Sequence, residues 1–442
     1  MHFNRHAYAF LQQWKVKKNR KPLILRGARQ VGKTTLVKHF SASYANTISL
    51  NLERPEHASY FKKYTDAKTL VEVLFISNNI TSDQKGNTLL FIDEIQESPE
   101  AIALLRYFYE DVPELHVIAA GSLLEHVMKN VKSFPVGRVE YLYVFPLNFL
   151  EYLEAKEQTS ALEQIHKIPV AEIAHDALLN LYNEYAIIGG MPEVIATFLA
   201  TQSVSDLPPV YESIWETYKS DIEKYAANNT DARIIRHILA TAHLYVDQRI
   251  KFENFGKSNY RSREVGEAMR NLNDARIIQL IPDHQKSPRL QYLDTGLINY
   301  ELNIQADMLA MADLNTAYKG AIIPHLVTQE IISLNSHSYS TPHFWVREKT
   351  QSSSEVDLVM QYKDMVIPIE IKSGKEGKLK SLHQFMEHVN HPFAVRMYAG
   401  KFCIEKHETP TTNKPYLLMN LPYYLGCKIN EYLSYFVKNH HI

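Results

Sequence analysis

The stretch LILRGARQVGKTTL, residues 23–36, decides the fold of the N-terminal part of this chain. It contains a complete GxxxxGK[ST] pattern between an apolar run that predicts a buried strand and a run of helix formers. In that context the glycines let backbone N–H groups curl around phosphates, and the helix N-terminus adds a positive field. The pattern therefore predicts a loop that binds a nucleoside triphosphate. The expected binding residues are Gly27, Ala28, Arg29, Gln30, Val31, Gly32, Lys33, Thr34 and Thr35.

A second motif, TLLFIDEI at residues 88–95, predicts a strand that ends in two carboxylates. Beside a phosphate-binding loop, this pattern is typical of a site that hydrolyses ATP with Mg²⁺. We expect Lys33 to bridge the phosphates, and Thr34 together with Asp93 to hold the metal. Glu94 is placed to polarise the attacking water as a general base.

Several short motifs together resemble one prokaryotic family, and the resemblance runs from about Arg5 to about Phe385. The family consists of AAA-type ATPases fused to a C-terminal domain of unknown function with a PD-(D/E)xK, restriction-endonuclease-like fold. The motifs are GARQVGKTTL (27–36), FIDEIQ (91–96), GS (121–122), PVGR (135–138), FPL (145–147), GGMPE (189–193) and DTGL (294–297).

The resemblance to AAA-type ATPases implies further roles around the nucleotide. Ser122 follows an apolar strand, at the place where such proteins keep a polar residue that senses the γ-phosphate. Arg138 is expected to reach the nucleotide of a neighbouring subunit in a homo-oligomer and to stabilise transition-state charge. Arg106 is a weaker candidate for that role, and a surface arginine in a turn is the alternative for Arg138.

The predicted fold class is α/β, with a three-layer P-loop domain at the N-terminus. The stretch 148–225 is mostly helical and resembles the lid of AAA-type domains; GGMP at 189–192 interrupts it. Residues 352–354, three consecutive serines, are expected to form a mobile loop before a strand. The expected domains are an ATPase core (1–147), a helical lid (148–228), a winged-helix-like module (229–301) and a nuclease-like α/β domain (302–442).

Composition limits the other possibilities. The net charge of −1 gives no global basic field, so a nucleic-acid surface would have to be local. Cys403 and Cys427 lack metal-site spacing, and we expect reduced thiols in a cytoplasmic protein without a signal peptide. No apolar run approaches the ~20 residues that cross a bilayer, so no membrane partner is expected.

A D…ExK pattern near the C-terminus predicts a second site. Glu370 and Lys372 alternate with isoleucines on an expected strand and so share one face, where Asp357 from an adjacent strand could join them. Such a trio can hold Mg²⁺ and activate water for phosphodiester cleavage. The resemblance implies a further glutamate four residues after Gly320, but that position is Pro324; Glu330 lies later on the same helix. A retained fold that serves as a binding module is the alternative to an active nuclease.

The stretch 260–281 predicts an amphipathic helix followed by a strand, a pattern that resembles the recognition element of a winged helix. Arg261, Arg263 and Arg270 lie on its polar side, where they could contact double-stranded DNA. The alternatives are a protein-binding surface and simple solvation.

These patterns favour an ATP-hydrolysing, Mg²⁺-dependent AAA-type protein that couples turnover to rearrangement of a DNA-binding or nuclease-like C-terminal half. Two alternatives stay open: an ATP-regulated, metal-dependent DNA endonuclease, and a nucleotide-switched module that binds a protein partner.

Overall fold

The chain, described here by a computed structural model, divides into two compact units. Unit 1 comprises Met1–Phe145, Asn271–Ile277 and Asn335–Tyr339; unit 2 comprises Pro146–Arg270, Ile278–Leu334 and Ser340–Ile442. The structure describes residues 3–122, 135, 137–222, 226, 228–282, 287–305, 320–337, 342–349, 352–374 and 379–442. The finer division into four domains stays a prediction.

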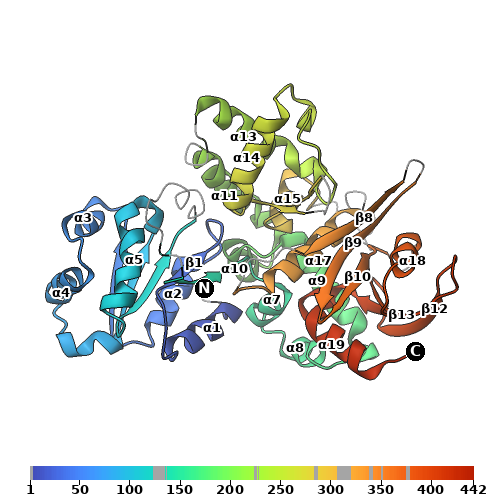
Figure 1. Cartoon of the computed structure of the whole chain (residues 1–442), viewed down its shortest axis with the longest axis horizontal. Helices are drawn as coiled ribbons and strands as arrows, with labels where there is room; N and C mark the ends of the chain where they lie inside the picture. Colours follow the sequence, from blue (N-terminus) through green and yellow to red (C-terminus); the bar gives the residue numbers. More distant parts are fainter. Residues whose placement is uncertain are drawn as a thin grey trace. The chain divides into compact units, whose positions relative to one another are not determined.

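Unit 1 is built on a five-stranded parallel sheet with the order β2-β3-β4-β1-β5 (Figure 1). Its strands are β1 (Leu23–Arg26), β2 (Asn46–Asn51), β3 (Thr88–Asp93), β4 (His116–Ala120) and β5 (Glu140–Tyr143). Its helices include α1 (His6–Lys15), α2 (Lys33–Ser41), α3 (Pro55–Lys63), α4 (Ala67–Ser77) and α5 (Pro99–Asp111). The predicted α/β class with a parallel sheet is confirmed for this unit.

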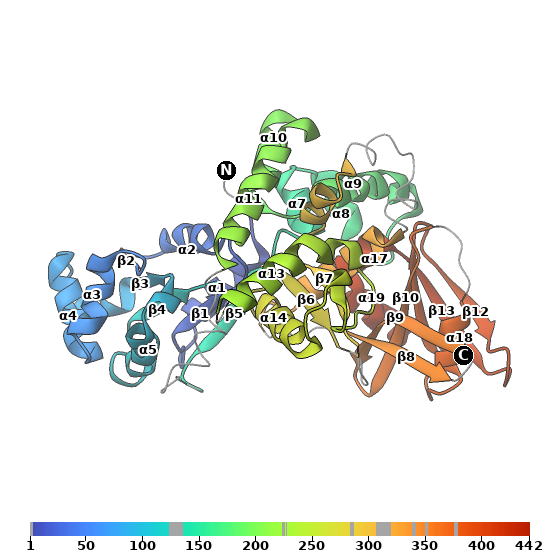
Figure 2. The ribbon, with the colours of Figure 1, turned by 90° about the horizontal axis from the view of Figure 1, so that it is seen from above.

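The strand order explains how the helices cover the sheet. The connection from β1 to β2 and the connection from β3 to β4 run in opposite directions across it. Because such crossovers are right-handed, α2 and α5 must lie on opposite faces, as Figure 2 shows. The carboxyl ends of parallel strands meet at one edge, so the loop after β1, the end of β3 and the residues after β4 come together there.

Unit 2 begins with a helical region in which the GGMPE and DTGL motifs interlock. Its helices are α7 (Phe149–Ala155), α8 (Thr159–Ile165), α9 (His175–Ile188), α10 (Pro192–Thr201), α11 (Pro208–Ser220), α13 (Asn229–Thr241), α14 (Ser262–Asp274) and α15 (Thr295–Glu301), and the part of α14 from Asn271 onward belongs to unit 1. The buried Asp294 carboxylate accepts the N–H groups of Gly190 at 2.6 Å and Gly296 at 3.0 Å. A Cβ on Gly189, which has φ +73°, would lie 2.2 Å from Asp294 Oδ1. Close packing of the two motifs therefore accounts for this glycine.

The rest of unit 2 carries a two-stranded hairpin, β6 (Ile278–Ile281) with β7 (Arg289–Tyr292), and a mixed sheet with the order β12-β13-β11-β10-β9-β8. The sheet strands are β8 (His343–Lys349), β9 (Ser352–Tyr362), β10 (Met365–Ile371), β11 (Phe393–Tyr398), β12 (Cys403–Glu408) and β13 (Pro415–Pro422). Helices α17 (Ile322–Ser333), α18 (Lys380–Met386) and α19 (Ile429–Asn439) accompany it.

Two expectations from the sequence meet a direct check here. The predicted loop at 352–354 is wrong, because Ser352 begins β9 and pairs with Lys349 of β8, so cross-strand pairing overrides the low strand propensity of serine. No helix among the described residues is long and apolar enough to cross a bilayer.

Candidate functional site

The phosphate-binding loop joins β1 to α2 and has the backbone that its sequence requires. Gly32 adopts a left-handed conformation with φ 92°, and α2 begins directly after it at Lys33. A Cβ on Gly27 would lie only 2.2 Å from the carbonyl oxygen of Val144, which follows β5. The loop can therefore take this path only with glycine at position 27.

Lys33 is buried, and its ammonium group is held inside the loop. Its Nζ donates to the carbonyl oxygens of Gly27 at 2.9 Å and Ala28 at 2.7 Å. Both acceptors are neutral, whereas phosphate oxygens are charged and form stronger bonds with an ammonium group. A nucleotide phosphate at this loop would thus compete well for Lys33.

Thr34 and Asp93 meet at the edge of the sheet and provide two hard oxygen ligands. The Thr34 hydroxyl donates to Asp93 Oδ2 at 2.9 Å. Burial raises the pKa of Asp93, while the Thr34 hydrogen bond and Lys33 oppose the shift. Mg²⁺ prefers one or two such oxygens with phosphate oxygens and waters completing the octahedron. The residues present fit a Mg²⁺ ion bound together with a nucleotide.

Glu94 occupies a strained position next to this pair. Its backbone is left-handed, with φ 52°, an uncommon conformation for glutamate. Its carboxylate accepts the Nε2 amide of Gln96 at 2.5 Å, from the short 3₁₀-helix that begins at Ile95. The turn after β3 therefore fixes the direction of the Glu94 side chain, and Gln96 holds its carboxylate in this conformation.

Arg5 braces the loop from outside, a role that no sequence motif indicated. It precedes α1, and its guanidinium donates to the carbonyl oxygens of Val31 at 3.0 Å and Phe145 at 2.6 Å. The two acceptors belong to the phosphate-binding loop and to the FPL motif after β5. Because the partners lie 26 and 140 residues away, only the fold reveals the contact.

The other residues predicted around the nucleotide differ in their burial. Arg29 forms an exposed ion pair with Glu53 at 3.3 Å, and Thr35 is exposed on α2. Ser122 follows β4 and is buried, and its hydroxyl has no hydrogen-bond partner in the described part of the chain. It lies at the same edge of the sheet as Asp93, because β3 and β4 are parallel neighbours.

The two arginines considered for a role in trans converge on one carboxylate. Arg138 Nε donates to Glu110 Oε1 at 2.8 Å, and Arg106 Nε donates to the same oxygen at 3.0 Å. The Arg138 hydrogen bond is the largest cause that lowers the pKa of Glu110. About half of the Arg138 side chain is exposed, so a partner can still reach it.

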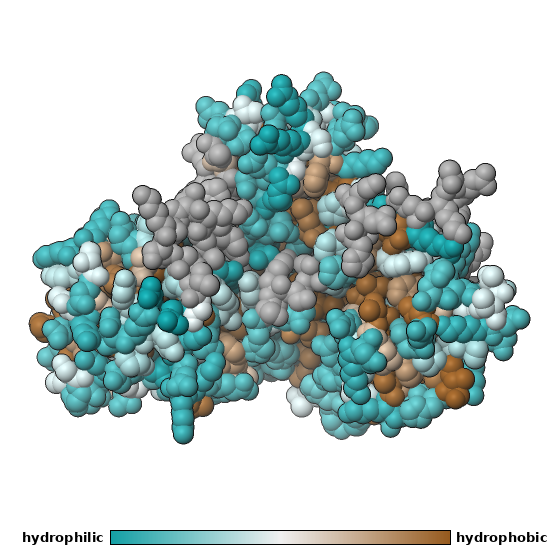
Figure 3. Space-filling view, viewed as in Figure 1, coloured by the Kyte–Doolittle hydropathy of each residue, from teal (hydrophilic) through white to brown (hydrophobic). Residues whose placement is uncertain are grey.

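The arginines of α14 lie on its solvent side. Val265, Met269 and Leu272 are buried, whereas Arg261, Arg263 and Arg270 are exposed. The surface over α13 and α14 is largely hydrophilic in Figure 3. The predicted amphipathic helix is thus present, with its cations free of the core.

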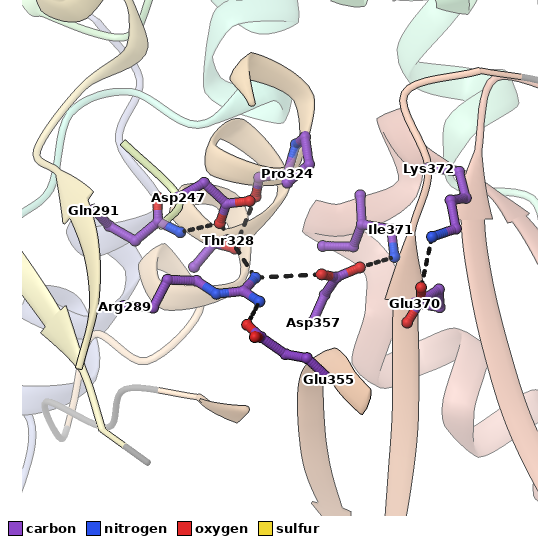
Figure 4. Close-up of polar contacts among 10 residues, drawn as sticks. All are labelled: Asp247, Arg289, Gln291, Pro324, Thr328, Glu355, Asp357, Glu370, Ile371 and Lys372. Carbon is purple, nitrogen blue, oxygen red and sulfur yellow. Dashed lines mark hydrogen bonds and ion pairs between the residues drawn. The ribbon is translucent and has the colours of Figure 1, made fainter. Parts of the chain in front are cut away.

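The structure brings together Asp357 of β9, Glu370 of β10 and Lys372, which directly follows β10 (Figure 4). Ile369 pairs with Leu358 across the two strands, and Asp357 Oδ2 accepts the N–H of Ile371 at 2.7 Å. Lys372 Nζ lies 2.5 Å from Glu370 Oε1. Burial, followed by the Asp357 charge, raises the pKa of Glu370 to about 7.

Glu330, the other acid considered for this site, is engaged elsewhere in the described structure. Its fully buried carboxylate accepts the N–H of Phe149 at 3.1 Å and lies 2.9 Å from the Tyr185 hydroxyl. Burial raises its pKa to about 8. In the described residues, no group of three or more His, Cys, Asp or Glu side chains has the arrangement of a metal site.

Comparisons with known proteins match three parts of the chain to family models. Residues 19–153 match an AAA domain family, which supports a P-loop ATPase. Residues 179–308 and 319–416 match two domains of unknown function, DUF8612 and DUF4143. A comparison with curated proteins finds no match.

Solved structures show distant similarity. The Aeropyrum pernix ORC2 protein, in ADPNP–ADP complexes, is 14% identical, with 69% of this chain and 93% of that chain covered and a TM-score of 0.34. Cdc6p from Pyrobaculum aerophilum is 10% identical, with 69% and 94% covered and a TM-score of 0.25. Hsp104 with ATPγS and FITC-casein is 14% identical, with 61% and 50% covered and a TM-score of 0.26.

Proposed function

We propose that this protein is a Mg²⁺-dependent ATPase of the AAA type that couples turnover to rearrangement of its C-terminal half. The observation that carries the proposal is the meeting of Thr34 and Asp93 at 2.9 Å beside the buried Lys33. A hydroxyl, a carboxylate and an ammonium group at one sheet edge are the groups that a nucleoside triphosphate and its metal need.

Each group has a distinct part in the proposed reaction. Lys33 would exchange the carbonyls of Gly27 and Ala28 for phosphate oxygens. Thr34 and Asp93 would hold Mg²⁺, and the ion would neutralise charge on the phosphates. Glu94 accepts a proton from the water that attacks the terminal phosphorus, and ADP leaves as the bond to the terminal phosphoryl group breaks.

Equilibrium binding of ATP to the Lys33→Ala variant tests this proposal. Truncating one partner of a buried, hydrogen-bonded charge pair costs about 2 kcal/mol or more, so we expect affinity to fall at least ~30-fold. Lys38→Ala is the matched control, since Lys38 is exposed on the same helix. Equal affinity in wild type and Lys33→Ala would refute the nucleotide site.

A second candidate function is contact with double-stranded DNA through α14. The exposed Arg261, Arg263 and Arg270 favour it, because phosphate contacts by arginine dominate affinity for DNA. Replacing all three by Ala should weaken duplex binding and reduce its salt dependence. Unchanged binding and salt dependence would leave α14 as a solvated or protein-binding surface, and a wild type that binds no duplex would refute this candidate.

A further inference from the structure

Unit 2 contains a cavity of about 400 Å³ that no sequence motif indicated. Its described lining comes from α11, from Ile222 just after that helix, from α13 and from Glu301, the last residue of α15. Figure 1 shows the three helices together in the upper part of the view. Sites for small molecules have volumes of about 300–1,000 Å³, so the cavity is large enough for a small ligand.

Apolar side chains form a rigid part of the cavity wall. Trp215, Ile222 and Leu239 line the cavity, and all three are buried. The Trp215 ring meets the rings of Tyr218 and Tyr292 edge to face, with 5.9 Å and 6.1 Å between ring centres. Because these neighbours hold the indole in place, the wall is formed before a ligand arrives, and binding orders few side chains.

Two side chains of opposite charge border this wall from different helices. Arg236 of α13 is exposed and makes no hydrogen bond or ion pair with any residue that the structure describes. Glu301 of α15 is half-buried, and within the same residues its carboxylate accepts no hydrogen bond. Burial raises the pKa of Glu301, and the charge of Lys219 opposes the shift. Both groups therefore have hydrogen-bonding capacity left for a ligand.

A second cavity, of about 330 Å³, adjoins the first, since the two share Trp215, Lys219 and Glu301. Two further carboxylates line it, Glu212 and Glu216, and Glu216 pairs with Lys219 at 3.1 Å. The side of the cavity formed by α11 and α15 is therefore net negative, whereas the side formed by α13 carries a cation. This separation of charge favours a ligand that carries both signs.

We propose that this cavity binds a small zwitterion with an apolar body, of the class of the free apolar amino acids. Arg236 is the partner of the ligand carboxylate, Glu301 is the partner of its ammonium group, and the apolar side chain lies against Trp215 and Leu239. A ligand with only one of the two charges leaves one of these protein groups without its counter-ion. The site lies within unit 2, and the proposal does not depend on nucleotide turnover.

Isothermal titration calorimetry of the full chain with L-phenylalanine and L-leucine tests the proposal. 3-Phenylpropanoate lacks the ammonium group of phenylalanine, and phenethylamine lacks its carboxylate. Each analogue should bind about tenfold more weakly than L-phenylalanine, or weaker still, since a hydrogen bond to a charged group contributes at least that factor. If neither amino acid binds, or if either analogue binds as tightly as L-phenylalanine, the proposal is overturned.

Two variants assign each ligand charge to its residue. Arg236→Ala should lower the affinity for L-phenylalanine about tenfold and should not lower the affinity for phenethylamine, which has no carboxylate. Glu301→Gln should lower the affinity for L-phenylalanine and spare 3-phenylpropanoate, which has no ammonium group. Arg233→Ala is the matched control, because Arg233 is exposed on the same helix outside the cavity lining. Unchanged affinity for L-phenylalanine in Arg236→Ala would overturn the assignment, as would an equal loss for phenethylamine.

A variant that fills the cavity keeps the test decisive if a change of charge impairs folding. Ala240 lines the cavity and is exposed on α13, so Ala240→Phe can occupy the space of the ligand without disturbing the buried core. It should abolish binding of both amino acids and leave the thermal unfolding temperature near that of the wild type. Wild-type affinity in Ala240→Phe would show that the amino acids bind elsewhere and would overturn the proposal.

Discussion

At the scale of single residues, the candidate nucleotide site depends on contacts that bring distant parts of the chain together. The sequence motifs alone identify Lys33, Thr34 and Asp93. Arg5 lies outside every motif, yet its hydrogen bonds join the phosphate-binding loop, at Val31, to Phe145 after β5. By donating to these two backbone carbonyls, the Arg5 guanidinium holds the loop in place without contacting a ligand. Arg5 is therefore a positioning residue.

We expect Arg5→Ala to weaken ATP binding by about tenfold, because it removes two hydrogen bonds from a charged donor, each worth roughly 1.5–3 kcal/mol, part of which water replaces. Arg5→Lys should recover only part of the affinity, since one ammonium group cannot reproduce the fork that spans both carbonyls. Titration with a fluorescent ATP analogue measures the effect. Wild-type affinity in Arg5→Ala would show that the loop holds its shape unaided.

At the scale of elements, the sequence predicted well what local pattern determines. Strands β1 and β3 could be predicted because each is an apolar run that leads directly into a functional motif. The first precedes the phosphate-binding loop, and the second ends in the carboxylates Asp93 and Glu94. The strand at Ser352 was missed, since its partner in β8 and not its composition makes it a strand. The ion pairs of Arg289 on β7 with Asp247, Glu355 and Asp357 were missed for a similar reason, because these partners lie up to 68 residues from Arg289 in sequence.

The elements around Glu330 form a chain of hydrogen bonds that requires a proton. The Tyr185 hydroxyl has one hydrogen but faces two oxygens, Leu147 O at 2.7 Å and Glu330 Oε1 at 2.9 Å. Both contacts are satisfied when Tyr185 donates to Leu147 and a protonated Glu330 donates to Tyr185. The raised pKa of Glu330, about 8 because of burial, agrees with this arrangement of α7, α9 and α17.

This proton makes the stability of unit 2 depend on pH. The folded state keeps the proton up to about pH 8, whereas the unfolded carboxyl releases it near 4.5, so the free energy of unfolding falls as pH rises between these values. The slope from one proton reaches about 1.4 kcal/mol per pH unit. Thermal unfolding measured from pH 5.5 to 8.5 should show that the free energy of unfolding declines less with pH in Glu330→Gln than in wild type.

Glu193→Gln is the control for this experiment, because Glu193 is exposed on α10. Its free energy of unfolding should decline with pH as steeply as that of the wild type. If the free energy of unfolding of Glu330→Gln declines as steeply as that of the wild type, Glu330 is ionised in the folded protein. The hydrogen bonds around Tyr185 must then have other donors and acceptors than those given above.

At the scale of the whole molecule, the proposed role of Arg138 requires assembly. Turnover per subunit should then rise with protein concentration, and Arg138→Ala should lower it by ~10³-fold or more without loss of ATP binding. Arg106→Ala removes the other partner of Glu110 and separates the two candidates, since it should leave turnover unchanged if Arg138 is the residue that acts in trans. A rate that does not change with concentration in a proven monomer would exclude action in trans.

The central claim, that this chain hydrolyses ATP at the edge formed by β1, β3 and β4, is tested most directly by turnover and binding in Glu94→Gln. The account predicts that this variant binds Mg²⁺–ATP as tightly as wild type and turns it over at least ~100-fold more slowly, because the amide cannot accept the proton of the attacking water. Glu97→Gln, an exposed neighbour, should retain full activity. Undiminished turnover in Glu94→Gln, or a wild type that releases no ADP with Mg²⁺, would contradict the account.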